Sequence, residues 1–244
     1  MNPLDRITVV LVEPSTPGNI GSTARVLKNT GISRLVLVKP CPWDTPEARR
    51  MAHGSGEILD ACRICPDLNT AVADAHFVIG TTHRLGRFRE VCSTPRQSIA
   101  RVASLAHHHE VAIVFGREKD GLWRNEIDSC HQLIRFPSAT SFPSFNLSHA
   151  VLLFTYELFH AVRGAEVPER KNLATAAERE RLYQHLGEAM DAVEFNHFND
   201  NPRHFTRILR GLFNRIELEK RDVMAVHKIC GQIRKFAARH KTIA

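Results

Sequence analysis

The chain has 244 residues, of which 43% are hydrophobic, with a formal net charge of +7 and a pI near 9.3. This length provides one good core and a smaller second unit, so we expect one or two domains. The basic balance favours an anionic partner, with nucleic acid as the first candidate, although a charge of this size also serves solubility alone. No apolar run approaches the roughly 20 residues of a membrane span, and the amino terminus lacks a signal-peptide core, so we expect a cytoplasmic protein.

Short apolar runs alternate with helical patterns over the first two thirds of the chain. Continuous runs rich in β-branched residues predict buried strands at 7–12, 34–38, 77–80, 111–115 and 133–136. Apolar periodicity and end signals predict helices at about 20–30, 95–106, 125–130 and 147–162, with short helices in the less regular stretch 43–73. This alternation predicts an α/β fold with a mostly parallel sheet flanked by helices. We expect this domain to span residues 1–164.

A polar linker at 165–175 precedes a predicted all-helical extension at 176–244. Its helices are expected at about 175–193, 202–215 and 220–239. Two of them carry apolar stripes at helical spacing, which consist of Leu182, Leu186, Met190 and Val193, and of Ile208, Leu209, Leu212 and Ile216. From residue 201 onward there are eleven Lys and Arg against three Asp and Glu, an excess of eight. A basic helical extension of this kind provides phosphate contacts.

Three segments at or just beyond the ends of predicted strands have the composition of a binding site. They are Gly18–Arg25, with the letters GNIGSTAR, then Phe115–Glu118, and then Ser144–Ser148. In a parallel sheet, loops at the carboxyl ends of strands converge on one crevice, where ligands bind. Glycines allow a ligand to approach the backbone, and free amides at a helix start attract anions. An ordinary surface role for Arg25, taken alone, remains the simpler interpretation.

Several common catalytic signatures are missing from the sequence. The GxxG spacing differs from GxGxxG, and the second strand ends in Lys39 rather than in an acidic residue, which disfavours a dinucleotide dehydrogenase. There is no Walker motif, no GxSxG and no HExxH. We expect His107–His109 to lie in an exposed turn. Cys62 and Cys65 are expected to be incidental free thiols, rather than a zinc or redox pair.

Taken in order, the motifs resemble a known family. They are VxLVExxxPGNIGSTARVLKNTGI followed by LVLVxP, then VIGTT, VAIVFGREKDGL and FNLSHAVLLFTYEL. This series is similar to the SPOUT superfamily of RNA methyltransferases, and within it to the TrmJ-type tRNA 2′-O-methyltransferases, which modify nucleotide 32 of the anticodon loop. The match covers about the first two thirds of the chain. The tail segment 210–215, with the letters RGLFNR, also resembles the tail of that subgroup.

The resemblance implies a sheet domain whose carboxyl half is threaded into a deep trefoil knot, and a homodimer with each site at the subunit interface. It implies tRNA as substrate, S-adenosylmethionine as methyl donor and no metal. By motif position Arg25 corresponds to the catalytic arginine and Asn19 to a motif asparagine, while Ser144 and Asn146 orient the ribose or the cofactor. The implied cofactor residues are Thr81, Thr82, His83, Gly116, Arg117, Glu118, Phe136, Pro143, Ser144 and Phe145. His83 and Pro143 depart from the family pattern, so a contact there is expected through the backbone.

Arginine stays protonated in proteins, so we expect Arg25 to hold the adjacent phosphate and to stabilise charge on the attacking ribose oxygen. Three alternatives remain open. One is a SPOUT methyltransferase that acts on ribosomal RNA, and another is a non-catalytic RNA-binding protein of the same fold. The intact Asn19, Arg25 and Asn146 speak against the non-catalytic protein. The third is a small-molecule α/β enzyme, which the basic tail disfavours.

Overall fold

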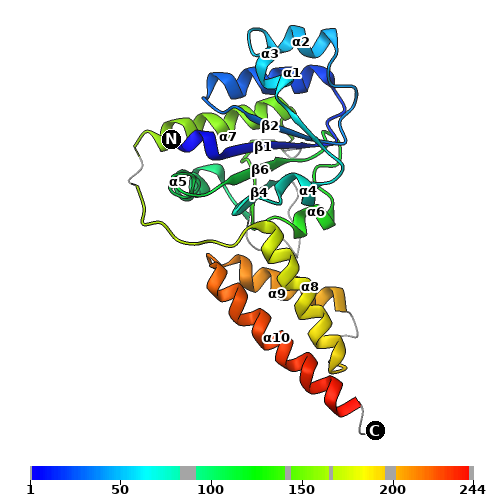
Figure 1. Cartoon of the computed structure of the whole chain (residues 1–244). Helices are drawn as coiled ribbons and strands as arrows, with labels where there is room; N and C mark the ends of the chain where they lie inside the picture. The colour runs from blue at the N-terminus through cyan, green and yellow to red at the C-terminus, as the bar shows by residue number, and fades with distance from the viewer. Residues whose placement is uncertain (1, 83–91, 141–143, 165–166, 196–201, 242–244) are drawn as a thin grey trace. The chain divides into compact units, whose positions relative to one another are not determined.

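The computed structural model describes residues 2–82, 92–140, 144–164, 167–195 and 202–241 (Figure 1). The chain divides into two compact units, Met1–Arg170 and Lys171–Ala244. His83 and Pro143, two of the predicted cofactor residues, lie outside the described residues. The implied trefoil knot stays a prediction, because residues 83–91 and 141–143 also lie outside them. No helix among the described residues is long and apolar enough to cross a membrane.

A seven-stranded parallel sheet forms the centre of the first unit, in the order β3-β2-β1-β6-β4-β7-β5. The strands are β1 Ile7–Val12, β2 Arg34–Val38, β3 Arg63–Cys65, β4 Phe77–Thr81, β5 Cys92–Ser93, β6 Val111–Phe115 and β7 Gln132–Ile134. The five expected strands are confirmed, although β7 begins and ends slightly earlier than its apolar run suggested. The two additional strands, β3 and β5, have three and two residues, too few for a hydrophobic period to reveal.

The centre of the sheet is buried on both faces. Val9, Val10 and Leu11 on β1 are fully buried, as are Ile79 on β4 and Ile113 on β6. Continuous apolar runs are typical of such strands, because neither face meets water. The register aligns the carboxyl ends of β1 and β6, with Leu11 opposite Phe115. The loops after these strands therefore leave the sheet at one edge.

Helices of the first unit follow the strands in sequence. They are α1 Pro17–Asn29, α2 Pro46–Ala52, α3 Gly56–Asp60, α4 Leu68–Val72, α5 Pro95–Ala106, α6 Arg124–Asp128 and α7 Leu147–Val162, and a 3-10 turn, Pro3–Arg6, precedes β1. Helix α7 contacts both α1 and α5, and Figure 1 shows it between them. These contacts join α1, α5 and α7 into one packed layer of helices.

Helix α1 begins earlier than the sequence suggested. It starts at Pro17, because proline at a first helical position is preset for the helix and has no N–H to leave unpaired. The segment Gly18–Arg25 is therefore helical throughout, which corrects the expected helix start near residue 20. A Cβ at Gly21 would overlap the backbone of Ala48 on α2. Gly21 thus serves the close approach of two helices rather than the approach of a ligand.

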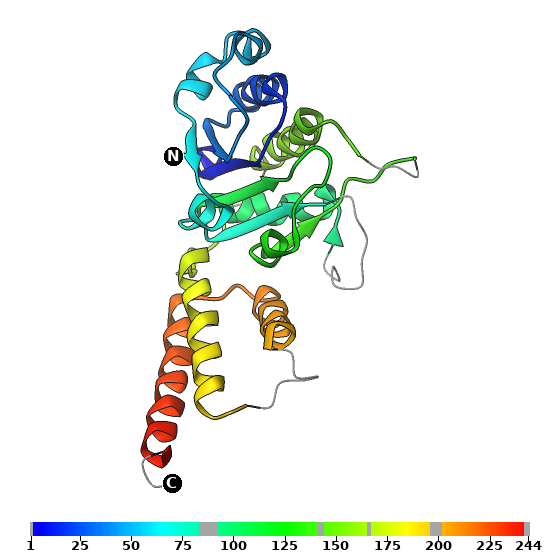
Figure 2. The ribbon, with the colours of Figure 1, turned by 90° about the vertical axis from the view of Figure 1, so that its right-hand side faces the viewer.

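The second unit contains three helices among its described residues, α8 Ala176–Ala192, α9 Pro202–Asn214 and α10 Lys220–Lys241. Figure 2 shows α8 and α10 side by side, in agreement with their contacts. A small core cluster consists of Ala174, Leu182, Leu218 and Val223, with Leu186, Phe213 and Val226 packed against it. The stripe on α9 is not part of this core, since Ile208 and Leu212 are 50% and 56% exposed.

Candidate functional site

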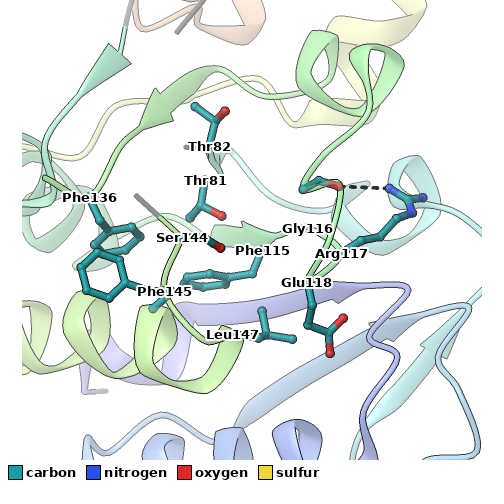
Figure 3. Close-up of a pocket in the computed structure, with 12 residues that line it drawn as sticks. Thr81, Thr82, Phe115, Gly116, Arg117, Glu118, Phe136, Ser144, Phe145 and Leu147 are labelled. Atoms are coloured by element: carbon teal, nitrogen blue, oxygen red, sulfur yellow. Dashed lines mark hydrogen bonds between the residues drawn. The ribbon is translucent and has the colours of Figure 1, made fainter. Parts of the chain in front are cut away.

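A cavity lies beyond the carboxyl ends of β4, β6 and β7 and contains about 560 Å³ of empty space, counting the part open to solvent (Figure 3). Every described residue among the predicted cofactor residues lines it, namely Thr81, Thr82, Gly116, Arg117, Glu118, Phe136, Ser144 and Phe145. Their convergence from three loops is the behaviour expected at this edge of a parallel sheet.

Aromatic rings form one wall of the cavity. Phe136 and Phe145 meet edge to face, with centroids 6.1 Å apart and an interplanar angle of 69°. Figure 3 shows the hydroxyls of Thr81 and Ser144 beside these rings, and the backbone of Gly116 across from them. A Cβ at Gly116 would overlap the backbone of Gly121, because the two strands of this turn approach closely. The cavity therefore combines apolar faces with a few polar groups, the usual composition of a ligand site.

A directional hydrogen-bond chain joins three distant segments beside the cavity. Asn19 Nδ2 donates to Glu118 Oε1 at 3.2 Å, and Asn146 Nδ2 donates to Asn19 Oδ1 at 2.9 Å. Asn146 Oδ1 then accepts from the N–H of Ser148 at 3.0 Å and caps α7. Because an ionised carboxylate only accepts, Glu118 fixes the orientation of the Asn19 amide, and this amide fixes that of Asn146.

Glu118 is held in its ionised form. Burial raises the pKa of its carboxyl, but hydrogen bonds from the backbone N–H and hydroxyl of Ser15 and from Asn19 outweigh burial, so the pKa lies below its ordinary value. The series of hydrogen bonds from Asn146 through Asn19 to Glu118 therefore keeps its direction at neutral pH.

Arg117 lines the cavity, but its guanidinium is engaged elsewhere. It makes two bonds of 2.9 Å to Glu126 and a third of 2.8 Å from Nε to Glu13, and Figure 3 shows it directed away from the cavity. The Glu13 carboxyl has a lowered pKa because it accepts this hydrogen bond. The guanidinium carbon also lies 3.5 Å from the ring centroid of Trp123. Any contact of Arg117 with a ligand in the cavity therefore falls to its backbone.

Arg25 does not reach the cavity within one chain. It is exposed on α1, and no hydrogen bond or ion pair joins it to the described residues. Arg25 lies six positions after Asn19, which places the two side chains about 120° apart around the helix. The structure thus brings Asn19, Asn146 and Ser144 to one place, and leaves the predicted catalytic arginine outside it.

Sequence reasoning missed Ser15, Glu13, Trp123 and Glu126, which support the site loops. A weak signal existed for Glu13, since it directly follows a buried strand. His107–His109 form a turn as expected, but the turn is not exposed, because His109 is 6% exposed and His107 and His108 are half-buried. Cys62 is a free thiol, and burial raises its pKa to about 11, which disfavours a reactive thiolate.

Two family models match the chain. SpoU rRNA Methylase family matches residues 6–156, and tRNA methyltransferase TrmJ, C-terminal domain, matches residues 177–242. The chain is 36% identical over 247 residues to the tRNA (cytidine/uridine/adenosine-2′-O-)-methyltransferase TrmJ of Pseudomonas aeruginosa, covering 96% of each protein. The chain belongs to the TrmJ family of SpoU methylases. The resemblance indicated by the motifs is thereby confirmed.

Solved structures agree with this membership of the TrmJ family. The crystal structure of TrmJ from Z. mobilis superimposes with a TM-score of 0.79 at 27% identity, covering 93% of this chain and 98% of that one. The SpoU methyltransferase AviRb from Streptomyces viridochromogenes, in complex with the cofactor AdoMet, gives a TM-score of 0.51 at 20% identity over 64% of this chain and 60% of that one. At that identity the likeness supports only the fold. The expected α/β fold with a helical extension is confirmed.

Proposed function

We propose that this protein is a cytoplasmic enzyme that transfers the methyl group of S-adenosylmethionine to a ribose 2′-hydroxyl of tRNA. One observation carries the proposal: in a chain similar to TrmJ over 96% of its length, every described residue of the expected cofactor loops lines one cavity. We further propose nucleotide 32 of the anticodon loop as the target. Ribosomal RNA remains the second candidate, since the model for the first unit is named for rRNA methylases.

The cavity fits S-adenosylmethionine in its chemistry. The rings of Phe136 and Phe145 offer apolar faces to an adenine, and the hydroxyls of Thr81 and Ser144 and the backbone beside Gly116 offer polar partners. When bound, this cofactor supplies an electrophilic methyl group on a positively charged sulfur. The residues of the chain then have to hold the ribose in line with that group and keep water away.

In this proposal, the side-chain amides of Asn19 and Asn146 position the ribose. Asn146 is locked by its bond to Asn19 and by its cap on α7, so it presents one fixed N–H edge toward a ribose. Ser144 lies at the cavity and adds a hydroxyl. Arg25 holds the neighbouring phosphate and stabilises negative charge that develops on the attacking oxygen. The ribose proton leaves to the phosphate or to water.

A homodimer completes the site in our proposal. Arg25 is outside the cavity of its own chain, so the partner subunit has to provide it. An apolar surface suited to pairing lies on α7, where Leu152, Leu153 and Tyr156 are 40%, 42% and 54% exposed. Helix α1, which carries Arg25, is packed directly against α7. A two-fold pairing through this layer therefore brings an Arg25 to each cavity.

Mixed dimers test this arrangement. If Arg25 acts across the interface, a one-to-one mixture of Arg25→Ala and Asn146→Ala chains regains about one quarter of the wild-type activity, because half of the dimers are mixed and each has one intact site. If Arg25 acts within its own chain, every site in a mixed dimer is defective. An inactive mixture that exchanges subunits normally therefore contradicts the shared site.

We also propose that residues 1–164 form the methyltransferase domain, 165–175 a linker and 176–244 a tRNA-binding extension. The excess of positive charge after residue 201 supports phosphate contacts. Lys228, Lys235 and Arg239 are exposed on α10, at spacings that place them on one face.

The decisive experiment is transfer of a labelled methyl group to total tRNA by the purified protein, followed by mapping of the modified nucleotide. Methylation of a ribose at position 32 is expected. Labelling of ribosomal RNA but not of tRNA supports the second candidate. Binding of RNA without binding of S-adenosylmethionine contradicts an enzymatic function.

A further inference from the structure

A second cavity opens at the same edge of the sheet, beyond β2 and β3, with about 540 Å³ of empty space, counting the part open to solvent. Val38, Pro66 and Trp123 are among the residues that line it. It adjoins the cofactor cavity through Arg117, whose partners Glu13 and Glu126 form part of its wall. None of the site residues predicted from the motifs lines this cavity.

Trp123 is an unusual residue for its position and its exposure. It occupies the N-cap position of α6, where Ser, Thr, Asp or Asn normally provides a hydrogen bond, and its side chain makes none. Its side chain is 51% exposed, although an indole is a large apolar group. Arg117 covers one face of the ring at 3.5 Å. Apart from this contact with Arg117, half of the side chain stays exposed, so the ring surface that lines the cavity is the feature to explain.

The charges around this ring disfavour a phosphate. Arg117 and Lys39 provide two positive charges, while Glu13, Glu126 and Asp67 provide three negative ones, so the wall is net negative by one. A flat, uncharged ligand avoids this penalty. An aromatic ring with one open face attracts such a ligand by stacking, and unpaired RNA bases commonly bind in this way.

Polar groups beside the ring are available to pair with a base edge. Asn69 Oδ1 accepts from the Ser129 hydroxyl at 2.9 Å, which directs the Asn69 NH₂ group away from Ser129. Within the described part of the chain, no hydrogen bond engages that NH₂ group or the side chain of Asn125. Both residues line the cavity and are exposed. They provide donors and an acceptor suited to the edge of a base.

We propose that this cavity binds an unpaired nucleobase of the RNA substrate, stacked on the open face of Trp123 and hydrogen-bonded by Asn69 and Asn125. The inference rests on the proposed function, since the RNA is the one to be methylated. Bases of a loop are unpaired and can turn out of their stack, so a nucleotide near the target ribose is a suitable occupant. Arg117 then links the two cavities, with its backbone at the cofactor and its guanidinium on the face of the Trp123 ring opposite the bound base.

Tryptophan emission provides a direct test, because the chain has only two tryptophans. Trp43→Phe leaves Trp123 as the sole reporter, and Trp123→Phe leaves Trp43. The probe is an unmodified RNA hairpin with the sequence of a tRNA anticodon stem and loop. We expect this hairpin to quench the emission of the Trp43→Phe protein, and to leave that of the Trp123→Phe protein unchanged.

Kinetics provide the second readout. Trp123→Ala is expected to raise the KM for tRNA about 5- to 100-fold, the usual loss when one stacked base is abandoned. The kcat at saturating tRNA and the Kd for S-adenosylmethionine should change little, and Trp123→Phe should restore most of the affinity, because a phenyl ring also stacks. Asn69→Ala and Asn125→Ala should have smaller effects on the same KM.

Three outcomes overturn the inference. Binding of a labelled hairpin, seen by anisotropy, without quenching of Trp123 places the RNA elsewhere. An equal loss of cofactor and tRNA binding in Trp123→Ala assigns the ring to the support of Arg117 alone. Absence of methyl transfer to tRNA by the wild-type protein overturns the proposed function together with this site, whereas normal transfer that is indifferent to Trp123 overturns only the site.

Discussion

The two units of this chain are stabilised in different ways. The first has a sheet whose central strands are fully buried, and its loops are tied by hydrogen bonds between residues about 100 apart, such as Asn19 and Glu118. Among its described residues the second has a small core cluster around Leu182 and Leu218, and it exposes apolar side chains on α9 and α10, among them Ile208, Leu212 and Phe236. Residues 171–244 also contain 14 Lys and Arg against 9 Asp and Glu, a larger relative excess than in residues 1–170.

Under the proposed function, this difference assigns catalysis to the first unit and RNA binding to the second. Catalysis requires groups held within a fraction of an ångström, which a rigid sheet and its tied loops provide. Attraction of a large anion requires positive charge at a surface, and it tolerates a smaller core. The comparison therefore predicts that changes in the first unit alter turnover or folding, and that changes in the second alter RNA affinity.

Arg25→Ala should have the largest effect. We expect kcat to fall about 100- to 1,000-fold, because a charge-stabilising donor is lost from the transition state. The thermal stability and the Kd for S-adenosylmethionine should stay near the wild-type values, since Arg25 is exposed and unpaired among the described residues. Arg25→Lys should recover only part of the loss, as a single ammonium cannot replace a forked guanidinium. Near-normal turnover in either variant argues against the assigned role.

A pair of glycine substitutions compares the stability of the two units. In Gly21→Ala the new methyl group overlaps the backbone of Ala48, so α1 and α2 have to separate, at a cost of about 1–3 kcal/mol or more. In Gly187→Ala on α8 the methyl group meets open space, and the helix should gain about 0.5–1 kcal/mol.

Both tryptophans, Trp43 and Trp123, lie in the first unit, so their emission during denaturation follows that unit alone. Gly21→Ala should shift the emission transition to lower denaturant. Gly187→Ala should leave the emission unchanged and raise the transition seen by helical circular dichroism. Equal shifts in both signals for either variant indicate that the units unfold together, which weakens the comparison.

Removing positive charge from α10 should weaken RNA binding without affecting the cofactor. In the triple variant Lys228→Ala, Lys235→Ala and Arg239→Ala, the slope of log affinity against log salt should decrease by about 3, one for each lost phosphate contact. Arg96→Ala, an exposed arginine on α5, is the matched control in the first unit and should leave the slope unchanged. An unchanged slope in the triple variant assigns the extension to a structural role.

The smallest effect concerns acid sensitivity of the second unit. His185 and His227 contact each other through their Nδ1 atoms at 2.8 Å. Burial, followed by the charges of His185 and Arg181, lowers the pKa of His227 from its ordinary value of 6.5. The unfolded chain thus takes up this proton more readily than the folded one, so stability is complete above about pH 6.5 and declines as the pH falls toward the lowered pKa.

Thermal unfolding of the helical signal at pH 7.5 and at pH 5.5 measures this decline. The Tm should fall in acid, and His227→Gln should reduce the fall, because glutamine does not titrate. An identical acid response in wild type and His227→Gln shows that other groups are responsible.

Local patterns were sufficient for much of the fold. The strands of the central sheet, the start of α7 at its asparagine cap and the helices of the extension follow from hydrophobic period, capping and breakers, all of which act within a few residues. The motif letters also selected residues that the fold brings together, since all eight described residues line one cavity.

Only the tertiary structure decided how distant residues are used. Gly21 approaches Ala48 instead of a ligand, Arg117 selects Glu13, which lies 104 residues away, and the apolar stripe on α9 stays exposed. The sequence around Trp123 contains no site signal, and this residue lines a cavity only because β2 and β3 end beside it. Local energies determine each element, but the partner of a side chain depends on which elements the topology brings together, and no short stretch of sequence contains that information.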